Sequence, residues 1–354
     1  MIVVLTSNYD GAMPQMAFQM RNEFMKIDGA SVVFIPSQTK TEDDEFVERY
    51  ERKNSLIPFD RQYAAIAKRI EAYNPRLVYV CDTNLITGRI IQRLPETIPV
   101  IMTVHDVNTH PNYQSLSVAI KGKMKSPYVM RALKKCNRIV LMSNNSYEGF
   151  KTKYPQFSNK LSLIRLGAHV PVVEDECPAE LEGLSGFILF FGRLDKYKGI
   201  INLLRAYEKK KGEIQHKIVI AGKGTLTDEE SNIINENPDG IILVKRYISD
   251  GEMIWLFKNA VCTVLPYIEA SQSGVLSMSF HFGKPVIVSD IDGLTEFVED
   301  GKTGVVFHDI DELSDALVSV PAHAEEMRND ILEYHDKNLD WEANIRRFLD
   351  DINE

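Results

Sequence analysis

The chain has 354 residues, a length at which two domains are expected because a single hydrophobic core stops growing at about 250–300 residues. With 44% hydrophobic and 26% charged residues it has the composition of a globular protein, and no stretch reaches the roughly 18 consecutive apolar residues of a membrane span. The formal net charge of −9 argues against a general nucleic-acid-binding protein.

Apolar runs typical of buried strands recur through the first half of the chain, separated by segments with helical periodicity. This alternation predicts a parallel, doubly wound sheet. The predicted strands are residues 2–5, 31–35, 77–80, 100–104, 138–142 and 161–166, and the predicted helices are 13–25, 62–72 and 143–154.

A second series of strands and helices begins at residue 187 and predicts a second sheet of the same kind. Its predicted strands are residues 187–191, 217–220, 241–244, 261–265, 286–289 and 305–307. Its predicted helices are residues 200–209, 250–258, 275–282 and 310–318.

Residues 169–186, between the two series, contain prolines and acids without periodicity, which is typical of a linker. We therefore predict two Rossmann-like β/α/β domains that face a central cleft, residues 1–170 and 187–335, joined by a linker at 171–186. A C-terminal segment, residues 336–354, contains an amphipathic helix that could pack back on the N-terminal domain.

Two cations follow the predicted strand 187–191. Arg193 comes after Gly192, where the backbone can turn tightly, and Lys198 precedes Gly199 and the next predicted helix. Ligands of α/β sheets bind at the carboxyl ends of strands, so both cations are placed to meet one. The Arg fork and the Lys point charge together suit a diphosphate; the alternative is two surface cations on a loop.

The predicted strand 261–265 is followed by an acid, Glu269, and a run of small or polar residues. The N–H groups at the start of the next predicted helix favour an anion, and small side chains let a ligand touch the main chain. Glu269 could accept hydrogen bonds from sugar hydroxyls or steady positive charge at an anomeric carbon. The alternative is that Ser273 only caps the helix. The run comprises Ala270, Ser271, Gln272, Ser273 and Gly274.

These segments resemble retaining glycosyltransferases of family 4. Members of this family have the GT-B architecture and use a nucleotide-sugar as the donor. The resemblance lies in FGRLDKYKG at 191–199, IVIAGKG at 218–224, YIEASQSGVLSMSFHFGKPVI at 267–287 and GLTEFVEDGKTGVVF at 293–307. It extends to TVHDVNTHP at 103–111, VLMSNNS at 140–146 and IRLGAH at 164–169. It implies that the C-terminal domain binds the nucleotide-sugar donor and the N-terminal domain the acceptor.

Carried over residue by residue, the resemblance implies that Arg193 and Lys198 hold the donor diphosphate and that Glu269 contacts the donor sugar. Residues 272–275, ending at Val275, would offer main-chain contacts to phosphate and sugar. Family members often have a second Glu eight residues after the first, thought to grip the ribose. This chain has Ser277 there.

Three further positions are candidates for the site. His105 ends the predicted strand 100–104 and could orient the donor sugar or bind the acceptor, as the resemblance also implies; the alternative is a neutral His bonded to loop carbonyls. Gly11, after the first strand, could let backbone approach a ligand, although a lone turn Gly is weak support without GxGxxG. Tyr247 or Ile248 could lie beside the nucleobase, or belong to an ordinary loop.

We expect neither a metal nor another cofactor. The DxD strings at 290–292 and 309–311 fit turns and helix starts, and Arg193 and Lys198 already supply positive charge. The basic, amphipathic segment 121–138 could contact an anionic membrane surface or be a solvated helix face.

The widely spaced cysteines and the absence of a signal-peptide pattern at the N-terminus predict a cytoplasmic protein, and the basic segment could place it at the inner face of the membrane. The leading hypothesis is a retaining hexosyltransferase that transfers a sugar from a nucleotide-sugar to a glycan or lipid-linked acceptor, in surface polysaccharide or glycoconjugate synthesis. The alternative is a non-catalytic sugar-nucleotide-binding or partner protein of the same architecture.

Overall fold

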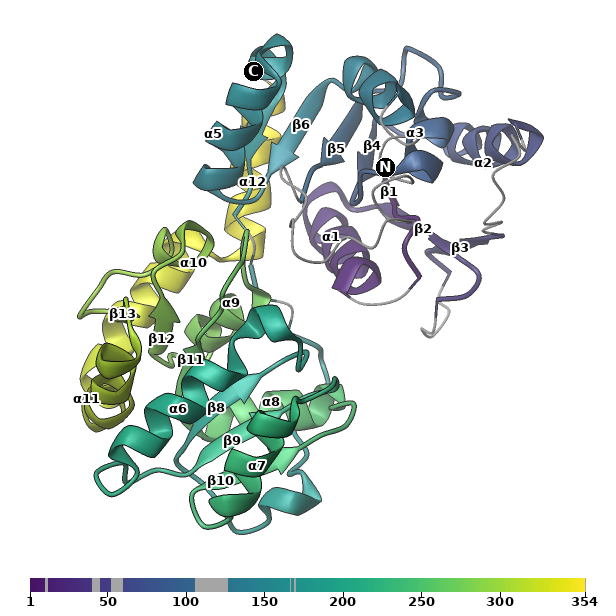
Figure 1. Cartoon of the computed structure of the whole chain (residues 1–354). Helices are drawn as coiled ribbons and strands as arrows, with labels where there is room; N and C mark the ends of the chain where they lie inside the picture. The colour runs from purple at the N-terminus through teal and green to yellow at the C-terminus, as the bar shows by residue number, and fades with distance from the viewer. Residues whose placement is uncertain are drawn as a thin grey trace. The chain divides into compact units, whose positions relative to one another are not determined.

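The computed structural model describes residues 1–9, 12–39, 45–51, 60–105, 127–165, 167–168 and 170–353. The chain forms two compact units, Met1–Arg165 with Trp341–Glu354, and Leu166–Asp340 (Figure 1). Each unit is built on a parallel sheet, so the predicted α/β fold with two Rossmann-like domains is confirmed.

The sheet of the first unit has the strand order β3-β2-β1-β4-β5-β6-β7. The strands β1, β2 and β4 are buried along their whole length, as expected for a parallel sheet that is covered on both faces. The edge strand β3 was not predicted, because its sequence VERY has no apolar run. The strands are β1 (Ile2–Leu5), β2 (Ser31–Pro36), β3 (Val47–Tyr50), β4 (Leu77–Val80), β5 (Val100–Thr103), β6 (Arg138–Leu141) and β7 (Leu161–Leu163).

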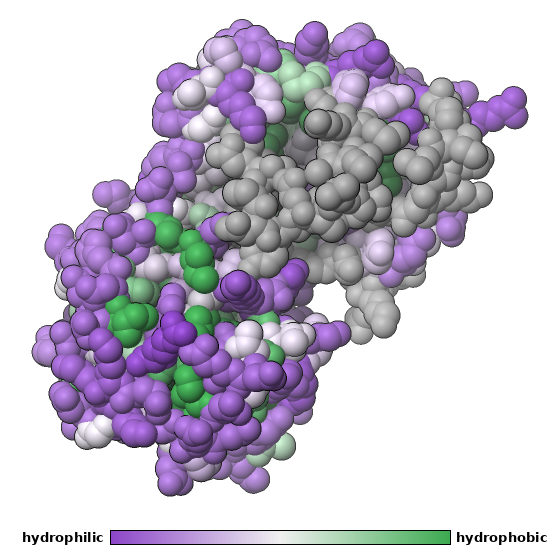
Figure 2. Space-filling view, in the orientation of Figure 1, coloured by the Kyte–Doolittle hydropathy of each residue, from purple (hydrophilic) through white to green (hydrophobic). Residues whose placement is uncertain are grey.

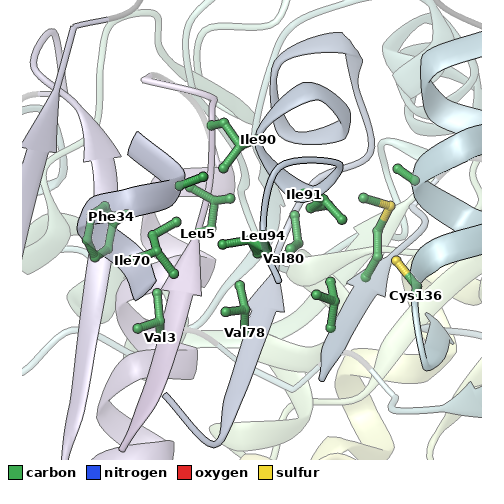
Figure 3. Close-up of a cluster of buried hydrophobic side chains, with 14 of the residues drawn as sticks. Val3, Leu5, Phe34, Ile70, Val78, Val80, Ile90, Ile91, Leu94 and Cys136 are labelled. Atoms are coloured by element: carbon green, nitrogen blue, oxygen red, sulfur yellow. The ribbon is translucent and has the colours of Figure 1, made fainter. Parts of the chain in front are cut away.

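Alternate side chains of the strands enter different cores of the first unit. Val3 and Val78 point to the face that α2 and α3 cover, where they meet Ile70 and Ile90 (Figure 3). Tyr79 points to the other face, where its ring packs against Phe24 of α1 at 5.4 Å between centroids. The described helices of this unit are α1 (Ala12–Asp28), α2 (Asp60–Ala72), α3 (Leu85–Ile91), α5 (Asn144–Lys153) and α12 (Trp341–Asn353), and residues 127–135 are also helical.

The last helix of the chain, α12, packs against α1 and so belongs to the first unit. Its apolar side chains Ile345, Phe348 and Leu349 are all at most 3% exposed. Burial of this one face, rather than helix propensity, is what holds a helix of this length in place.

The sheet of the second unit has the strand order β10-β9-β8-β11-β12-β13. Its strands are β8 (Phe187–Phe191), β9 (Ile218–Ala221), β10 (Ile241–Val244), β11 (Ala260–Leu265), β12 (Val286–Ser289) and β13 (Gly304–Phe307). Its helices are α6 (Ile200–Lys210), α7 (Asp228–Glu236), α8 (Asp250–Asn259), α9 (Gly274–His281), α10 (Asp292–Thr295) and α11 (Ile310–Asn338).

Two hydrophobic clusters cover the two faces of this sheet. One joins α6 and α11 through Leu203 and Leu317, and the other joins α8 and α9 through Phe257 and Met278. Leu181, from the segment expected to be a linker, is 1% exposed within the second cluster.

Each sheet has one place where the chain order reverses. In the second unit it lies between β8 and β11, because the chain leads from β8 to β9 on one side and from β11 to β12 on the other. In the first unit it lies between β1 and β4. Ligands of open α/β sheets bind at the carboxyl ends of the strands at such a point, so these two places are where a site is expected.

The packing of α12 gives a prediction. Phe348→Ala should lower the stability of the first unit by about 3–5 kcal/mol, because it leaves a cavity between α12 and its neighbours. Native-state hydrogen exchange in α1 would show the loss. The exposed Asp350→Ala is the control and should change stability by no more than about 0.5 kcal/mol. Unchanged protection of α1 in Phe348→Ala would contradict the packing.

Candidate functional site

The candidate site of the second unit is built from two loops at the order reversal of its sheet. Residues 192–199 follow β8 and residues 266–273 follow β11, and these two strands are neighbours. The loops are therefore side by side at the carboxyl edge, with the N-terminus of α9 following the second loop.

Two backbone contacts hold the loops together. The N–H of Ile268 donates a hydrogen bond to the carbonyl of Tyr197, at 2.8 Å. Gly199 has a φ of 65°, and a Cβ there would lie 1.8 Å from the carbonyl oxygen of Pro266. Only glycine fits this left-handed, close-packed position. Because Lys198 and Glu269 directly follow the hydrogen-bonded residues, the contact brings the predicted cation and carboxylate into the same small region.

Lys198 is the more enclosed of the two predicted cations. Its Nζ lies 3.6 Å from the ring centroid of Tyr267 and 5.1 Å from that of Tyr197. The pKa of Lys198 is lowered to about 8, chiefly by burial; Arg193 contributes to the lowering, and Tyr197 and Asp195 oppose it. The influence of Arg193 on this pKa places the two predicted cations within electrostatic reach of each other.

Arg193 is more exposed, with 75% of its side chain accessible to solvent, and it forms an ion pair with Asp195 in the same loop. An exposed pair of this kind is worth little to stability, so exchanging Asp195 for another anion costs little. Gly192, directly before it, has a φ of 125°, and a Cβ there would come 4.0 Å from Val275 at the start of α9. The structure thus brings together Gly192, Arg193, Lys198 and Val275.

The loop after β11 rests on the start of α10. A Cβ at Gly293 would lie 2.2 Å from the carbonyl oxygen of Ala270. The absence of a side chain at Gly293 therefore allows the loop to pack closely against α10. Glu269, Ser271 and Gln272 of the loop are half-buried. Gly293 begins the segment 293–307 that carries part of the family resemblance, but the sequence does not predict which loop packs against it.

The N-terminus of α9, like those of α6 and α10, has no side-chain cap. Ser273 occupies the N-cap position but makes no side-chain hydrogen bond to the first turn, all of whose residues the structure describes. Its Oγ lies 3.4 Å from the hydroxyl of Tyr267 instead. Thr227 and Ser249 cap α7 and α8 in the ordinary way. Ser273 thus stands at the N-cap position, as that alternative expects, but its side chain makes no capping hydrogen bond. Gly274 has open space beside it, since an added Cβ would meet nothing within 4 Å.

Ser277 lies within α9 and is 3% exposed. Tyr247 and Ile248 follow β10, which is separated from β11 by the strands β9 and β8. Tyr247 is 71% exposed and Ile248 8%. Arg246 beside them is bonded to both Glu180 and Glu252, which fixes the backbone of this loop.

His105 follows β5 in the first unit, and its Nε2 lies 2.7 Å from the carbonyl oxygen of Cys81, which follows β4. Because a carbonyl only accepts, Nε2 is the protonated nitrogen of this contact. The bonding to a loop carbonyl matches the alternative stated for His105, and it also fixes the ring at the carboxyl edge of the sheet.

The order reversal of the first sheet holds a polar cluster that sequence reasoning missed. Asp82 is 4% exposed and accepts hydrogen bonds from the N–H of Ser7 at 3.2 Å, from its Oγ at 2.9 Å and from Nδ2 of Asn84 at 2.8 Å. Asn84 also caps α3. The signal was the string CDTN directly after a buried strand.

Gly11 lies outside the described residues, as do Lys121–Ser126 of the basic segment. In its described part, Lys135 is already engaged, bonded to the carbonyl of Leu94 and 3.2 Å from a carboxylate oxygen of Glu96. The visible surface in Figure 2 is mostly hydrophilic, with hydrophobic residues in separate small groups. None of the helices described is long and apolar enough to cross a membrane.

Within the described residues, no group of three or more His, Cys, Asp or Glu side chains is placed to hold a metal ion. Of the two DxD strings, Asp309 caps α11 by accepting from the N–H groups of Asp311 and Glu312. Asp292 is the first residue of α10. Both strings thus mark helix starts.

Comparison with known proteins adds the family. Residues 180–337, which contain the whole candidate site of the second unit, match the family described as glycosyl transferases group 1. This segment is thus similar to the glycosyltransferases of group 1. The match covers less than half of the 354 residues and ends close to the boundary between the units at Asp340.

Two curated relatives agree with this assignment. An uncharacterized glycosyltransferase of Methanocaldococcus jannaschii, MJ1607, is 30% identical over 121 residues, 33% of this chain and 30% of that protein. Alpha-maltose-1-phosphate synthase of Mycobacterium tuberculosis is 21% identical over 254 residues, 64% of this chain and 66% of that protein. The chain spans less than two thirds of both relatives.

A solved structure extends the likeness to the whole chain. HepE of Anabaena, in complex with UDP-glucose, has a TM-score of 0.71 at 14% identity and covers 99% of both chains. At this identity the likeness concerns the fold alone, and it supports the GT-B fold class for the two units.

The contact between Gly293 and Ala270 can be tested without a ligand. Gly293→Ala should displace the loop 268–273 and speed hydrogen–deuterium exchange of its amides by about tenfold or more, equivalent to about 1.4 kcal/mol of local opening. Gly212→Ala is the control, because an added Cβ there meets nothing within 4 Å. Equal exchange in both variants would refute the support that α10 gives to the loop.

Proposed function

We propose that the chain is a retaining glycosyltransferase of family 4 that transfers a hexose from a nucleoside-diphosphate sugar to a hydroxyl of a glycan or lipid-linked acceptor, in the synthesis of a surface polysaccharide or glycoconjugate. One observation carries the proposal. Lys198, Arg193 and a helix start without a side-chain cap meet at the order reversal of a glycosyltransferase group 1 domain. Each of these features attracts an anion.

In this proposal the donor diphosphate lies between Lys198, Arg193 and the first N–H groups of α9. Arg193 leaves Asp195 to take a phosphate oxygen, and Gly192 and Gly274 give the ligand room. Glu269 accepts hydrogen bonds from the sugar hydroxyls, with Ser271, Gln272, Ser273 and Val275 around it. Tyr247 and Ile248 lie beside the base, and Ser277 takes the place of the family's ribose-binding acid.

The first unit binds the acceptor, with His105 at the carboxyl edge of its sheet. The acceptor oxygen forms a bond to the anomeric carbon as the bond from that carbon to the diphosphate breaks. The acceptor's proton passes to the leaving phosphate oxygen. Because the acceptor attacks the face of the sugar from which the diphosphate leaves, the configuration at the anomeric carbon is retained. Lys198 and Arg193 lower the barrier by stabilising the charge that grows on the diphosphate. The positive charge comes from side chains, so no metal is part of this proposal.

The proposed setting is the cytoplasm, with residues 121–138 touching an anionic membrane surface when the acceptor is lipid-linked. Cations close to such a surface contribute about 1 kcal/mol each. The engagement of Lys135 with Leu94 and Glu96 leaves the other cations of the segment to make the contact.

The first test is a thermal-shift panel with UDP, GDP, ADP and their sugars. A nucleotide at about 100 times its dissociation constant should add about 2.7 kcal/mol of stability.

Arg193→Ala and Lys198→Ala should each lower the rate of sugar transfer by roughly 100- to 1,000-fold, because each removes charge stabilisation of the leaving group. Lys196→Ala, an exposed cation in the same loop, is the matched control.

The outcomes separate the possible functions. Wild-type turnover in both the Arg193 and the Lys198 variants contradicts the proposed site. Nucleotide binding without transfer or donor hydrolysis favours the non-catalytic alternative, in which Ser277 marks a site that has lost the acid.

The pKa of Lys198 predicts how binding depends on pH. With a pKa of about 8 in the free protein, the amine is charged at pH 7 and mostly neutral at pH 9. A bound diphosphate raises this pKa, so binding takes up a proton above pH 8 and the affinity falls by up to about tenfold per pH unit. Calorimetry at pH 8.5 in two buffers of different ionisation enthalpy measures the proton. Lys198→Arg, which stays charged, should abolish the uptake.

A further inference from the structure

The most unusual contact of the candidate site is between Lys198 and the buried ring of Tyr267. The ammonium nitrogen lies 3.6 Å from the ring centroid, well inside the roughly 6 Å over which an aromatic face attracts a cation. Tyr267 is 2% exposed, so the interaction takes place away from water, where it is strongest.

The ring is the fixed member of this pair. Its residue packs with Leu265, Phe280 and Val288 in one cluster, and its carbonyl accepts a hydrogen bond from Oγ of Ser289 at 2.6 Å. Burial raises the pKa of Tyr267, so its hydroxyl stays neutral at physiological pH. A lysine side chain has four rotatable bonds and loses much freedom when it is held in one place. The rigid ring can therefore decide where the ammonium lies.

The ring also takes the place that a carboxylate would have at a buried cation. Among the residues that the structure describes, no carboxylate forms an ion pair with Lys198, whereas Arg193 is paired with Asp195. A carboxylate would cancel the charge and repel an incoming diphosphate. An aromatic face stabilises the ammonium through its quadrupole and leaves the full positive charge for the ligand.

The same ring reaches the second anion-binding element of the site. The hydroxyl of Tyr267 lies 3.4 Å from Oγ of Ser273, directly before α9. One side chain thus contacts both the residue that carries the cation and the residue that begins the helix.

We propose that Tyr267 is a positioning residue, whose ring holds the Lys198 ammonium at the carboxyl edge between β8 and β11, next to the start of α9, in place to bind the diphosphate of the donor. This inference rests on the proposed function of the site. Tyr267 itself touches Lys198 and Ser273, not the reacting atoms.

A double-mutant cycle tests the proposal with UDP, GDP and ADP titrated in parallel by calorimetry. Tyr267→Phe keeps the ring and should bind the nucleotide within about threefold of wild type. Tyr267→Leu removes the ring and should weaken binding by about ten- to thirtyfold. In the Lys198→Ala background, Tyr267→Leu should have no further effect, because the residue acts through Lys198. Tyr267→Met, which fills a core flexibly, replaces Tyr267→Leu should that variant fail to fold.

The other possible results separate the positioning role of Tyr267 from the diphosphate site itself. Equal losses from Tyr267→Leu with and without Lys198 mean that the ring is merely structural, and the positioning role is refuted. Weakened binding in Lys198→Ala but not in Tyr267→Leu or Tyr267→Met refutes the positioning role and leaves the proposed function standing. Wild-type binding in Lys198→Ala refutes the diphosphate site itself, and the role of Tyr267 falls with it.

Discussion

The candidate site depends on the close approach of two loops that are about 70 residues apart in the chain. Gly199 lies against the carbonyl of Pro266, and the N–H of Ile268 is bonded to Tyr197. Any side chain at Gly199 would push the loops apart, and with them Lys198 and Glu269. The parallel sheet makes this approach possible, because it places β8 next to β11 and both loops at one edge. The arrangement of the candidate site residues thus depends on the backbone contact between these two loops.

In the proposed function, the charges of this site serve to bind the ligand rather than to stabilise the fold. Arg193 is exposed and paired with Asp195, Lys198 lies over an aromatic ring, and α9 begins without a side-chain cap. The aromatic ring and the lack of a side-chain cap leave positive potential at the carboxyl edge, and the ion pair of Arg193 is exposed and weak. Elsewhere in the same unit the usual solutions are present, such as the capping boxes of α7 and α8 and the bonding of Arg246 to two carboxylates.

The buried strands were predictable because each is a short apolar run, and β8 was predicted to the residue. The strand β3 was not, because VERY is polar, and α11 was ended at residue 318 although it continues through Pro321 to Asn338. Candidate residues at strand ends, such as Arg193 and Lys198, could be named from their position alone. The supports Tyr267 and Gly293 could not, because they act through contacts with residues distant in the chain.

The return of α12 to the first unit has a consequence for the way the chain can be divided. The second unit is one continuous stretch, Leu166–Asp340, whereas the first is assembled from both ends of the polypeptide. The second unit is therefore inserted into the first, as a guest domain is inserted into its host. During synthesis the second unit is complete before α12 is made, so α1 is made long before the helix that it packs against. The guest can be expressed alone as the single segment Leu166–Asp340, whereas expression of the host alone requires its two segments to be joined by a new linker.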